Sequence, residues 1–249
     1  MEVLKRAQKK AIVKYVDEEV VLPEEISREV YDNFKLYENK FTDGTIYSIK
    51  DYTEDKDSIK INVIKDKYSH FLYTKYKRPN LEYRCENTWS GAIIETKDNK
   101  FIFGKQSHMS EKDGMITITA GSTDLSDIIG ENVNYEKTFV REMYEEFGID
   151  ANNKDVVDNY YLKYFKIPCE NEEWSFGFIY KVKLNITFDE FYEMFHKYKK
   201  YLEENKLEVE FDEVYGIYKN REYILDYEKT EGIKLIPFYE ELLLKELEN

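Results

Sequence analysis

The residues of this sequence with the clearest chemical potential are three glutamates close together in mid-chain. The stretch Arg141-Glu142-Met143-Tyr144-Glu145-Glu146-Phe147-Gly148-Ile149 sets Glu142, Glu145 and Glu146 at helical spacing. At about 100° per residue, their carboxylates fall within one narrow arc of a helix. Apolar residues fall on the opposite side: Phe139, Val140, Met143, Tyr144 and Phe147. The pattern predicts a helix with one packed face and one face that gathers carboxylates.

Carboxylates on neighbouring turns repel one another, so the stability of an isolated helix does not explain the arrangement. A hard divalent cation, Mg²⁺ or Mn²⁺, would explain it, because such an ion prefers oxygen ligands and offsets the repulsion. Arg141 lies one turn before Glu145, where it can pair with a carboxylate and hold it in place. The alternative is a surface helix in a Glu-rich chain, whose acidic face is merely solvated.

Two residues mark the ends of this helix. Asn134 is a good helix cap, and Glu136 follows in the first turn, where a negative charge is favourable. Gly148 comes directly after the last periodic residue and suits a helix C-terminus in left-handed geometry. We therefore expect the helix to run between these two positions.

The same stretch resembles the second half of the Nudix box, which ends Arg-Glu-aliphatic-any-Glu-Glu-any-Gly-aliphatic. That half is complete here, but the first half departs from the family pattern. Val133 stands where the family has a glutamate, and Gly130-Glu131 resembles the family's Gly-Glu pair displaced by two residues. Thr119-Ala120-Gly121-Ser122 stands in place of a Pro-Gly-Gly turn. The departure concerns one acid, for which Glu131 is a possible substitute, and leaves the helix intact.

The resemblance implies hydrolysis, dependent on Mg²⁺ or Mn²⁺, of the diphosphate linkage in a nucleoside diphosphate joined to another moiety. A nucleotide sugar such as UDP-glucose, or ADP-ribose, is the expected substrate. Glu142, Glu145 and Glu146 would hold the metal, Arg141 would orient them, and Glu142 is the preferred general base. The rival interpretation is a catalytically weak Nudix domain that binds a nucleotide or protein partner without turnover, motivated by Val133 and the missing turn.

Nudix enzymes often place one more catalytic or metal-binding acid downstream of the box. The segment from 208 to 214 alternates like a strand and carries three acidic candidates. We rank Glu210 first and Glu208 and Asp212 next. A solvent-facing row of acids on a strand is the alternative.

Two further groups are candidates for substrate binding. Backbone N–H groups at Gly121 and Ser122 could approach a diphosphate, because a residue without a side chain permits close contact; the alternative is an ordinary turn. Trp174, with Phe176 and Tyr180, could stack on a base. The aromatic content of the chain is high, with 23 Tyr and 15 Phe, so packing is an equally good explanation for these rings.

Composition bounds the remaining possibilities. A net charge of −14 argues against a general affinity for nucleic acid or anionic membrane. Cys85 and Cys169 are widely separated, which speaks against a disulfide framework or a cysteine zinc site. His70, His108 and His196 lack the spacing of a metal cluster, so surface or packing roles are expected. The charged N-terminus and the lack of a long apolar segment predict a cytoplasmic protein without a membrane span.

The order of predicted elements favours an α+β fold. Strands are expected at 91–95, 101–105, 115–119, 160–167 and 175–183, with helices at 188–201 and 237–247. Together with the acidic helix they predict a Nudix-type mixed sheet sandwiched between helices over residues 89–249. For residues 1–88, the pattern predicts an N-terminal mixed α/β extension with strands at 11–21, 45–49 and 58–64. Dimerisation is common in the family, so a homodimer is possible.

The extension also shows a loose likeness to the N-terminal region of Nudix enzymes that act on UDP-sugars. The likeness rests on three short stretches, Lys40-Phe41-Thr42-Asp43-Gly44, His70-Phe71-Leu72-Tyr73 and Asn87-Thr88-Trp89. The alternative is a structural lobe packed on the catalytic domain.

Overall fold

The computed structural model describes residues 4–107, 115–167, 175–233, 235 and 237–248. The chain divides into two compact units. The N-terminal unit comprises Met1–Ser90, Gly121–Thr138 and Lys163–Phe178, and the C-terminal unit comprises Gly91–Ala120, Phe139–Leu162 and Ile179–Asn249. The first boundary lies close to the expected one between residues 88 and 89. The N-terminal unit differs from the expected extension because it also takes in two later segments.

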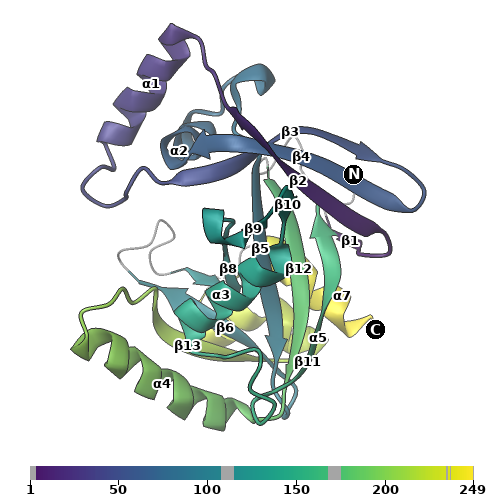
Figure 1. Cartoon of the computed structure of the whole chain (residues 1–249). Helices are drawn as coiled ribbons and strands as arrows, with labels where there is room; N and C mark the ends of the chain where they lie inside the picture. Colours follow the sequence, from purple (N-terminus) through teal and green to yellow (C-terminus); the bar gives the residue numbers. More distant parts are fainter. Residues whose placement is uncertain (1–3, 108–114, 168–174, 234, 236, 249) are drawn as a thin grey trace. The chain divides into compact units, whose positions relative to one another are not determined.

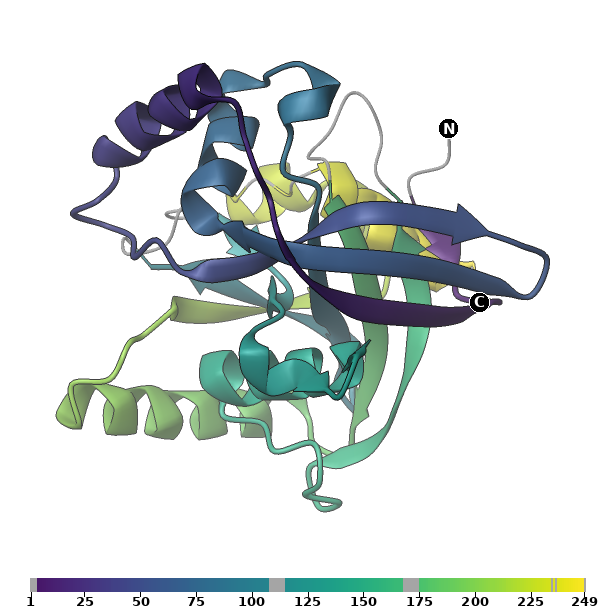
Figure 2. The ribbon, with the colours of Figure 1, turned by 45° about the horizontal axis from the view of Figure 1, so that its top comes forward.

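The N-terminal unit is built on three long strands, β2 (Lys10–Glu19), β3 (Thr45–Glu54) and β4 (Ser58–Lys67). Strand β4 pairs with β2 in parallel and with β3 antiparallel, so the sheet is mixed. Alternate residues of β4, namely Ile59, Ile61 and Val63, are buried, as expected for a strand with one packed face. Figure 1 and Figure 2 both show the three strands side by side.

Shorter strands extend this unit. Strand β10 (Asn132–Val133) pairs with β2, and β9 (Ile128–Ile129) pairs with β10. Strand β1 (Leu4–Arg6) pairs with residues 164–166 of β11 (Val157–Lys166).

Two helices complete the N-terminal unit, and they lie next to each other. Helix α1 (Glu24–Lys35) begins directly after Pro23 with two acidic residues, as the sequence predicts. Helix α2 (Tyr68–Lys77) follows β4 without a loop, and a 3₁₀ turn, η1 (Leu81–Tyr83), comes after it. The hydroxyl of Tyr73 on α2 donates a 2.5 Å hydrogen bond to the carboxylate of Glu29 on α1.

Strand β6 (Lys100–Gln106) is the centre of the sheet in the C-terminal unit. It pairs antiparallel with β5 (Asn87–Glu95), with β13 (Phe211–Tyr218) and with β7 (Ile116–Thr117). Strand β8 (Thr119–Ser122) pairs with β5, and β12 (Ser175–Leu184) is the other long strand. Gly104 in β6 is required for close packing, because a Cβ there would lie 2.4 Å from the ring of Phe211.

The helices of this unit pack an aromatic core. They are the last part of α3 (Tyr135–Phe147), then α4 (Phe188–Glu204), α5 (Arg221–Leu225), α6 (Tyr227–Glu231) and α7 (Pro237–Leu247). Thr187 caps α4 through a reciprocal bond pattern with Glu190, as expected from the sequence. Phe147 of α3 stacks on Phe211 with ring centroids 4.8 Å apart, so this core fixes the end of the acidic helix.

A second buried feature of this unit is a group of four charged side chains, which we call the balanced cluster: Glu95, Lys181, Lys219 and Glu246. The ammonium of Lys181 lies 2.6 Å from a Glu95 oxygen and 2.8 Å from a Glu246 oxygen, and that of Lys219 lies 3.2 Å from Glu95. Burial raises the pKa of Glu95, but the two ammonium groups outweigh burial, so this pKa is lowered.

The predicted α+β class with a mixed sheet is confirmed, and most of the predicted strands and helices are found within two or three residues of their expected bounds. Helices α2, α5 and α6 were not predicted. Among the described residues, no helix is both long and apolar enough to cross a bilayer.

Candidate functional site

Helix α3 begins and ends where the sequence predicts. The side-chain oxygen of Asn134 accepts a 3.1 Å hydrogen bond from the N–H of Lys137. At the other end, Gly148 has a φ of 71°, and its N–H donates to the carbonyl of Tyr144 at 2.9 Å. A Cβ at Gly148 would lie 2.6 Å from the ring of Tyr198 on α4. Glycine therefore serves both the left-handed turn and the close approach of α4.

The burial of residues on the two faces of α3 differs from the prediction. Met143 and Phe147 are fully buried, as expected, but Tyr144 is 53% exposed and does not belong to the packed face. Glu142 and Glu146 are buried as well, with 7% and 3% of their surface exposed. Glu145 lies at the surface, its side chain half exposed. A solvated acidic face is thus excluded for two of the three glutamates.

Arg141 makes the contacts predicted for it. Its Nη1 atom lies 2.7 Å from a Glu142 oxygen and donates a 2.9 Å hydrogen bond to a Glu145 oxygen. One guanidinium therefore bridges a buried and an exposed carboxylate and fixes their positions.

Glu146 is held by the first residues of strand β8. The N–H of Ala120 donates a 3.2 Å hydrogen bond to its carboxylate. Gly91 of β5 lets this backbone come close, because a Cβ at Gly91 would lie 2.6 Å from the Thr119 carbonyl oxygen. The sequence gives no sign that Ala120 is a partner of the acidic helix.

Of the three downstream acids, Glu210 is the one beside the box glutamates. It lies directly before β13, and its carbonyl accepts a 2.8 Å hydrogen bond from Ser107. The charge of its carboxyl group raises the pKa of both Glu142 and Glu146. Glu208 and Asp212 are exposed. We define the acid cluster as Arg141, Glu142, Glu145, Glu146 and Glu210.

Burial dominates the electrostatics of the acid cluster. It raises the pKa of Glu142 to about 8; Arg141 opposes this rise, and Glu210 and Glu145 add to it. Burial, followed by the charges of Glu210 and Glu142, raises the pKa of Glu146 well above its usual range. The pKa of Glu210 is raised by burial and then by Glu208. Several carboxylates therefore lack the positive charge that would stabilise their ionised forms.

The residues of the acid cluster fit a hard divalent ion. All of their donor atoms are carboxylate oxygens, the ligands that Mg²⁺ and Mn²⁺ prefer. Glu142, Glu146 and Glu210 lie near one another, as their mutual effects on pKa show. Glu145 is bound to Arg141 and has its side chain half exposed.

The remaining candidates are not part of this arrangement as described. Gly121 and Ser122 belong to the N-terminal unit, where the Ser122 hydroxyl accepts a 3.1 Å hydrogen bond from Asn87, so their role in diphosphate binding stays a prediction. Trp174 lies outside the described residues. Phe176 and Tyr180 are buried, packed against Phe178 and Phe139 respectively.

The degenerate first half of the box lies in the N-terminal unit. Val133 is buried in β10, and Glu131 is exposed and pairs with Lys14 at 3.7 Å. A buried acid that the sequence reasoning missed, Asp127, accepts a 3.0 Å hydrogen bond from the Thr138 hydroxyl and so supports the first turns of α3.

A second group that sequence reasoning missed joins Asp66, His70 and Cys85 in the N-terminal unit. The spacing of Asp66 and His70, four residues apart, is visible in the sequence. Cys85 is brought to them only by the fold. His196, in contrast, is partly exposed and pairs with Glu213 at 3.2 Å, and His108 lies outside the described residues.

No family model matches the chain, and no curated protein does. Among solved structures, the chain is similar to the Nudix domain of Shewanella oneidensis NrtR in complex with ADP ribose, at 11% identity and a TM-score of 0.40, over 68% of this chain and 92% of that one. It is also similar to a Nudix hydrolase from Nitrosomonas europaea, at 14% identity and a TM-score of 0.36, over 64% and 86% of the two chains.

A third similar structure is a MutT protein from Methanosarcina mazei Go1, at 15% identity and a TM-score of 0.36, over 65% and 91%. At such identities and TM-scores, the likeness is too distant to assign an activity or a substrate to this chain.

Proposed function

We propose that this chain is a Nudix-type hydrolase that cleaves the diphosphate linkage of a nucleoside diphosphate joined to another moiety, such as a nucleotide sugar or ADP-ribose. The proposal includes Mg²⁺ or Mn²⁺ bound by Glu142, Glu145 and Glu146, with Glu210 as a further ligand or acid. It rests on the intact motif from Arg141 to Ile149 and on the geometry of the acid cluster.

One observation carries the proposal. Glu142 and Glu146 are buried in the acid cluster together with the largely buried Glu210, and burial raises the pKa of all three. A fold gains nothing in stability from burying like charges, because their repulsion and their lost hydration both oppose folding. A cation and a phosphorylated substrate would supply the missing compensation. In the balanced cluster, by contrast, each buried carboxylate has an ammonium group within 2.8 Å.

The residues of the site take distinct parts in the proposed reaction. A divalent ion bound there supplies charge neutralisation at the diphosphate and activation of water. Arg141 holds Glu142 and Glu145 at fixed positions. Glu142 is the proposed general base, and a bound cation would keep it ionised, because burial raises its pKa to about 8. The N–H of Ala120 orients Glu146 as a ligand.

The proposal is tested by incubating the purified protein with UDP-glucose, ADP-ribose and related compounds in the presence of Mg²⁺ or Mn²⁺. Phosphate-containing products are followed by chromatography, with a chelator as the metal-free control. The matched control for Glu145→Gln and Glu146→Gln is Glu193→Gln, which changes an exposed glutamate of α4 that pairs only at the surface with Lys197. Full metal-dependent activity in both box variants would refute the assigned mechanism.

The second candidate function is nucleotide binding without turnover. It is favoured by buried Val133 at the position of a family glutamate, and by Glu131, which pairs with Lys14 in the N-terminal unit. Thermal stabilisation by a nucleotide sugar, with no product over several hours, would support this function. Efficient turnover of any compound in the panel would exclude it.

A further inference from the structure

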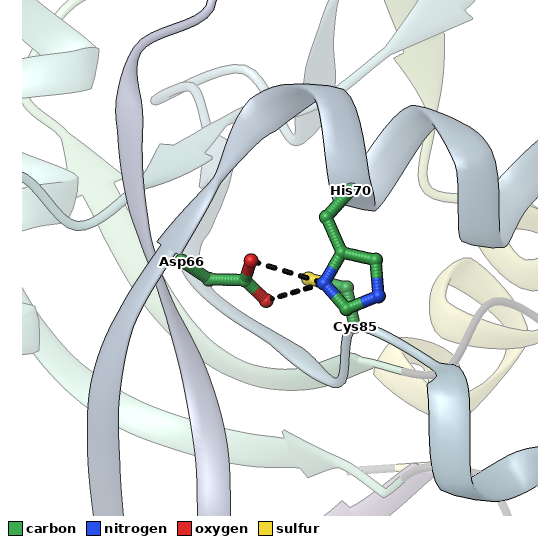
Figure 3. A group of neighbouring side chains, drawn as sticks. All are labelled: Asp66, His70 and Cys85. Carbon is green, nitrogen blue, oxygen red and sulfur yellow. Dashed lines mark hydrogen bonds and ion pairs between the residues drawn. The ribbon is translucent and has the colours of Figure 1, made fainter. Parts of the chain in front are cut away.

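Three side chains of different chemistry meet in the interior of the N-terminal unit. Figure 3 shows Asp66 at the end of β4, His70 on α2 and Cys85 in the segment before β5. Their potential ligand atoms all lie within 4.8 Å of one another, and all three residues are buried. This group takes no part in the proposed hydrolysis and is fully contained in one unit.

The hydrogen bonds of His70 fix which of its ring nitrogens faces the group. Its Nε2 lies 3.0 Å from the carbonyl oxygen of Tyr83, which only accepts, so Nε2 carries a proton and donates it. Its Nδ1 lies 2.9 and 3.0 Å from the two carboxylate oxygens of Asp66. A second proton or a cation must stand between Nδ1 and the carboxylate, because two lone pairs would otherwise face each other.

The contact of Nε2 with a backbone carbonyl is also the arrangement that orients metal-binding histidines. Such a bond fixes the tautomer and leaves the other nitrogen to the metal. Cys85 supplies a soft sulfur donor and Asp66 a hard oxygen donor beside it. A nitrogen, a sulfur and an oxygen together suit a borderline ion, whereas Mg²⁺ prefers oxygen alone.

We propose that Asp66, His70 Nδ1 and Cys85 Sγ form a structural Zn²⁺ site in the N-terminal unit. The Ser48 hydroxyl lies 2.5 Å from an Asp66 oxygen and 2.9 Å from Cys85 Sγ, so an oxygen donor is present for the fourth position. Zinc bonds of about 2.0–2.3 Å set tetrahedral ligand atoms roughly 3.4–3.8 Å apart. The four groups need to shift by about 1 Å or less to reach that spacing.

The charges balance in both states of the site. Without metal, the carboxylate of Asp66 outweighs the effect of burial and raises the pKa of His70, while burial keeps the Cys85 thiol protonated by raising its pKa. Zn²⁺ binding releases one proton from the imidazolium and one from the thiol. The product is a dication with one carboxylate and one thiolate, which is neutral overall and suited to a buried position.

The site would add a link between three parts of the N-terminal unit. It links the end of β4 to α2 and to the chain that leads into β5, where the Cys85 N–H already donates a 2.8 Å hydrogen bond to the Thr74 hydroxyl of α2. Because the group is buried, metal has to enter while the unit folds.

The first test measures metal content in the full chain. The protein is unfolded, refolded with excess Zn²⁺ and Mg²⁺ and desalted. Its metal content is then measured by inductively coupled plasma mass spectrometry. We expect about one Zn²⁺ per chain in wild type and less than a tenth of that in Cys85→Ala and His70→Asn. The matched controls Cys169→Ala, His196→Asn and Glu146→Gln should keep the zinc. Zinc retained by Cys85→Ala, or lost from Glu146→Gln, would overturn the proposal.

A second measurement needs no variant that weakens folding. Wild type refolded with Co²⁺ should show the absorption of a cobalt–thiolate bond, and Cys169→Ala should show it equally. A wild-type protein without this absorption and without bound zinc has only the hydrogen-bonded ion pair at Asp66 and His70, and the proposal fails. Neither result depends on whether the protein hydrolyses a nucleotide. The zinc site is therefore tested independently of the proposed function.

Discussion

Two buried groups of charged side chains in the C-terminal unit differ in their net charge. In the balanced cluster, Lys181 and Lys219 face Glu95 and Glu246, so positive and negative charges are equal in number. The acid cluster has four carboxyl groups and one guanidinium, that of Arg141, which contacts Glu142 and Glu145. The same unit thus contains one ion cluster with equal numbers of opposite charges and one with an excess of acids.

The pKa shifts reflect this difference. In both clusters burial acts to raise the pKa of a carboxyl group. At Glu95 the two lysines outweigh burial and the pKa is lowered, whereas at Glu142 Arg141 does not outweigh it and the pKa rises to about 8. A buried acid with a lowered pKa is typical of a structural ion pair, while a group of buried acids with raised pKa values is typical of functional sites.

The largest expected effect is on activity, in Glu146→Gln. This change removes a charged donor from the acid cluster and keeps its size, so the proposed turnover should fall on the order of 10³-fold. The melting temperature without metal should stay the same or rise, because one repelling acid is removed. Steady-state assays and thermal denaturation in chelator measure the two quantities. A large loss of stability with unchanged activity would show that Glu146 has a structural role, like the residues of the balanced cluster.

The next effect is on stability, in Lys181→Met. Removing this ammonium leaves Glu95 and Glu246 buried without their main partner, which should cost about 3–5 kcal/mol of unfolding free energy. Lys183→Met changes an exposed lysine of the same strand and is the matched control. Chemical denaturation followed by circular dichroism measures the difference. A cost below about 1 kcal/mol would show that the balanced cluster is not structural.

The third effect is a dependence of stability on pH. The pKa of Glu142 is near 8 in the folded chain against 4.5 as the ordinary value, so between these values the folded state binds more protons than the unfolded state. Stability without metal should therefore fall as pH rises from about 4.5 to 8, by at most about 1.4 kcal/mol per pH unit for this group. Saturating Mg²⁺ should flatten the slope.

Melting temperatures across this pH range, with chelator or with Mg²⁺, check that expectation. Glu142→Gln removes the titrating group and should reduce the slope even in chelator, while Glu193→Gln should leave it unchanged. Stability that rises with pH over the same range would contradict the raised pKa.

The sequence predicted which face of the helix carries the glutamates but not how deeply each side chain is buried. The helical spacing correctly placed Glu142, Glu145 and Glu146 on neighbouring turns, because that depends only on backbone geometry. Whether a side chain is covered depends on which other segments pack against the helix. Glu145 and Glu146 are adjacent in sequence, yet one is half exposed and the other nearly fully buried.

Contacts between distant segments were the least predictable. The balanced cluster draws its residues from β5, β12, the chain after β13 and α7, and no local pattern connects them. Helix α2 was missed because the residue before it, Lys67, provides no side-chain cap and its apolar residues form no clear stripe. Cys85 reaches Asp66 and His70 only after β4, α2 and η1 have folded together.

The smallest expected effect separates the downstream acids. The sequence ranked Glu210 ahead of Glu208 and Asp212, and Glu210 is the acid whose charge raises the pKa of Glu142 and Glu146. Glu208 is exposed, and its charge raises the pKa of Glu210. Glu208→Gln should therefore change stability by less than about 0.5 kcal/mol and kcat/KM by less than roughly threefold. Glu210→Gln should lower kcat/KM by on the order of 10²-fold or more. Equal losses in the two variants would mean that the exposed acid, and not only the buried one, contacts the metal or the substrate.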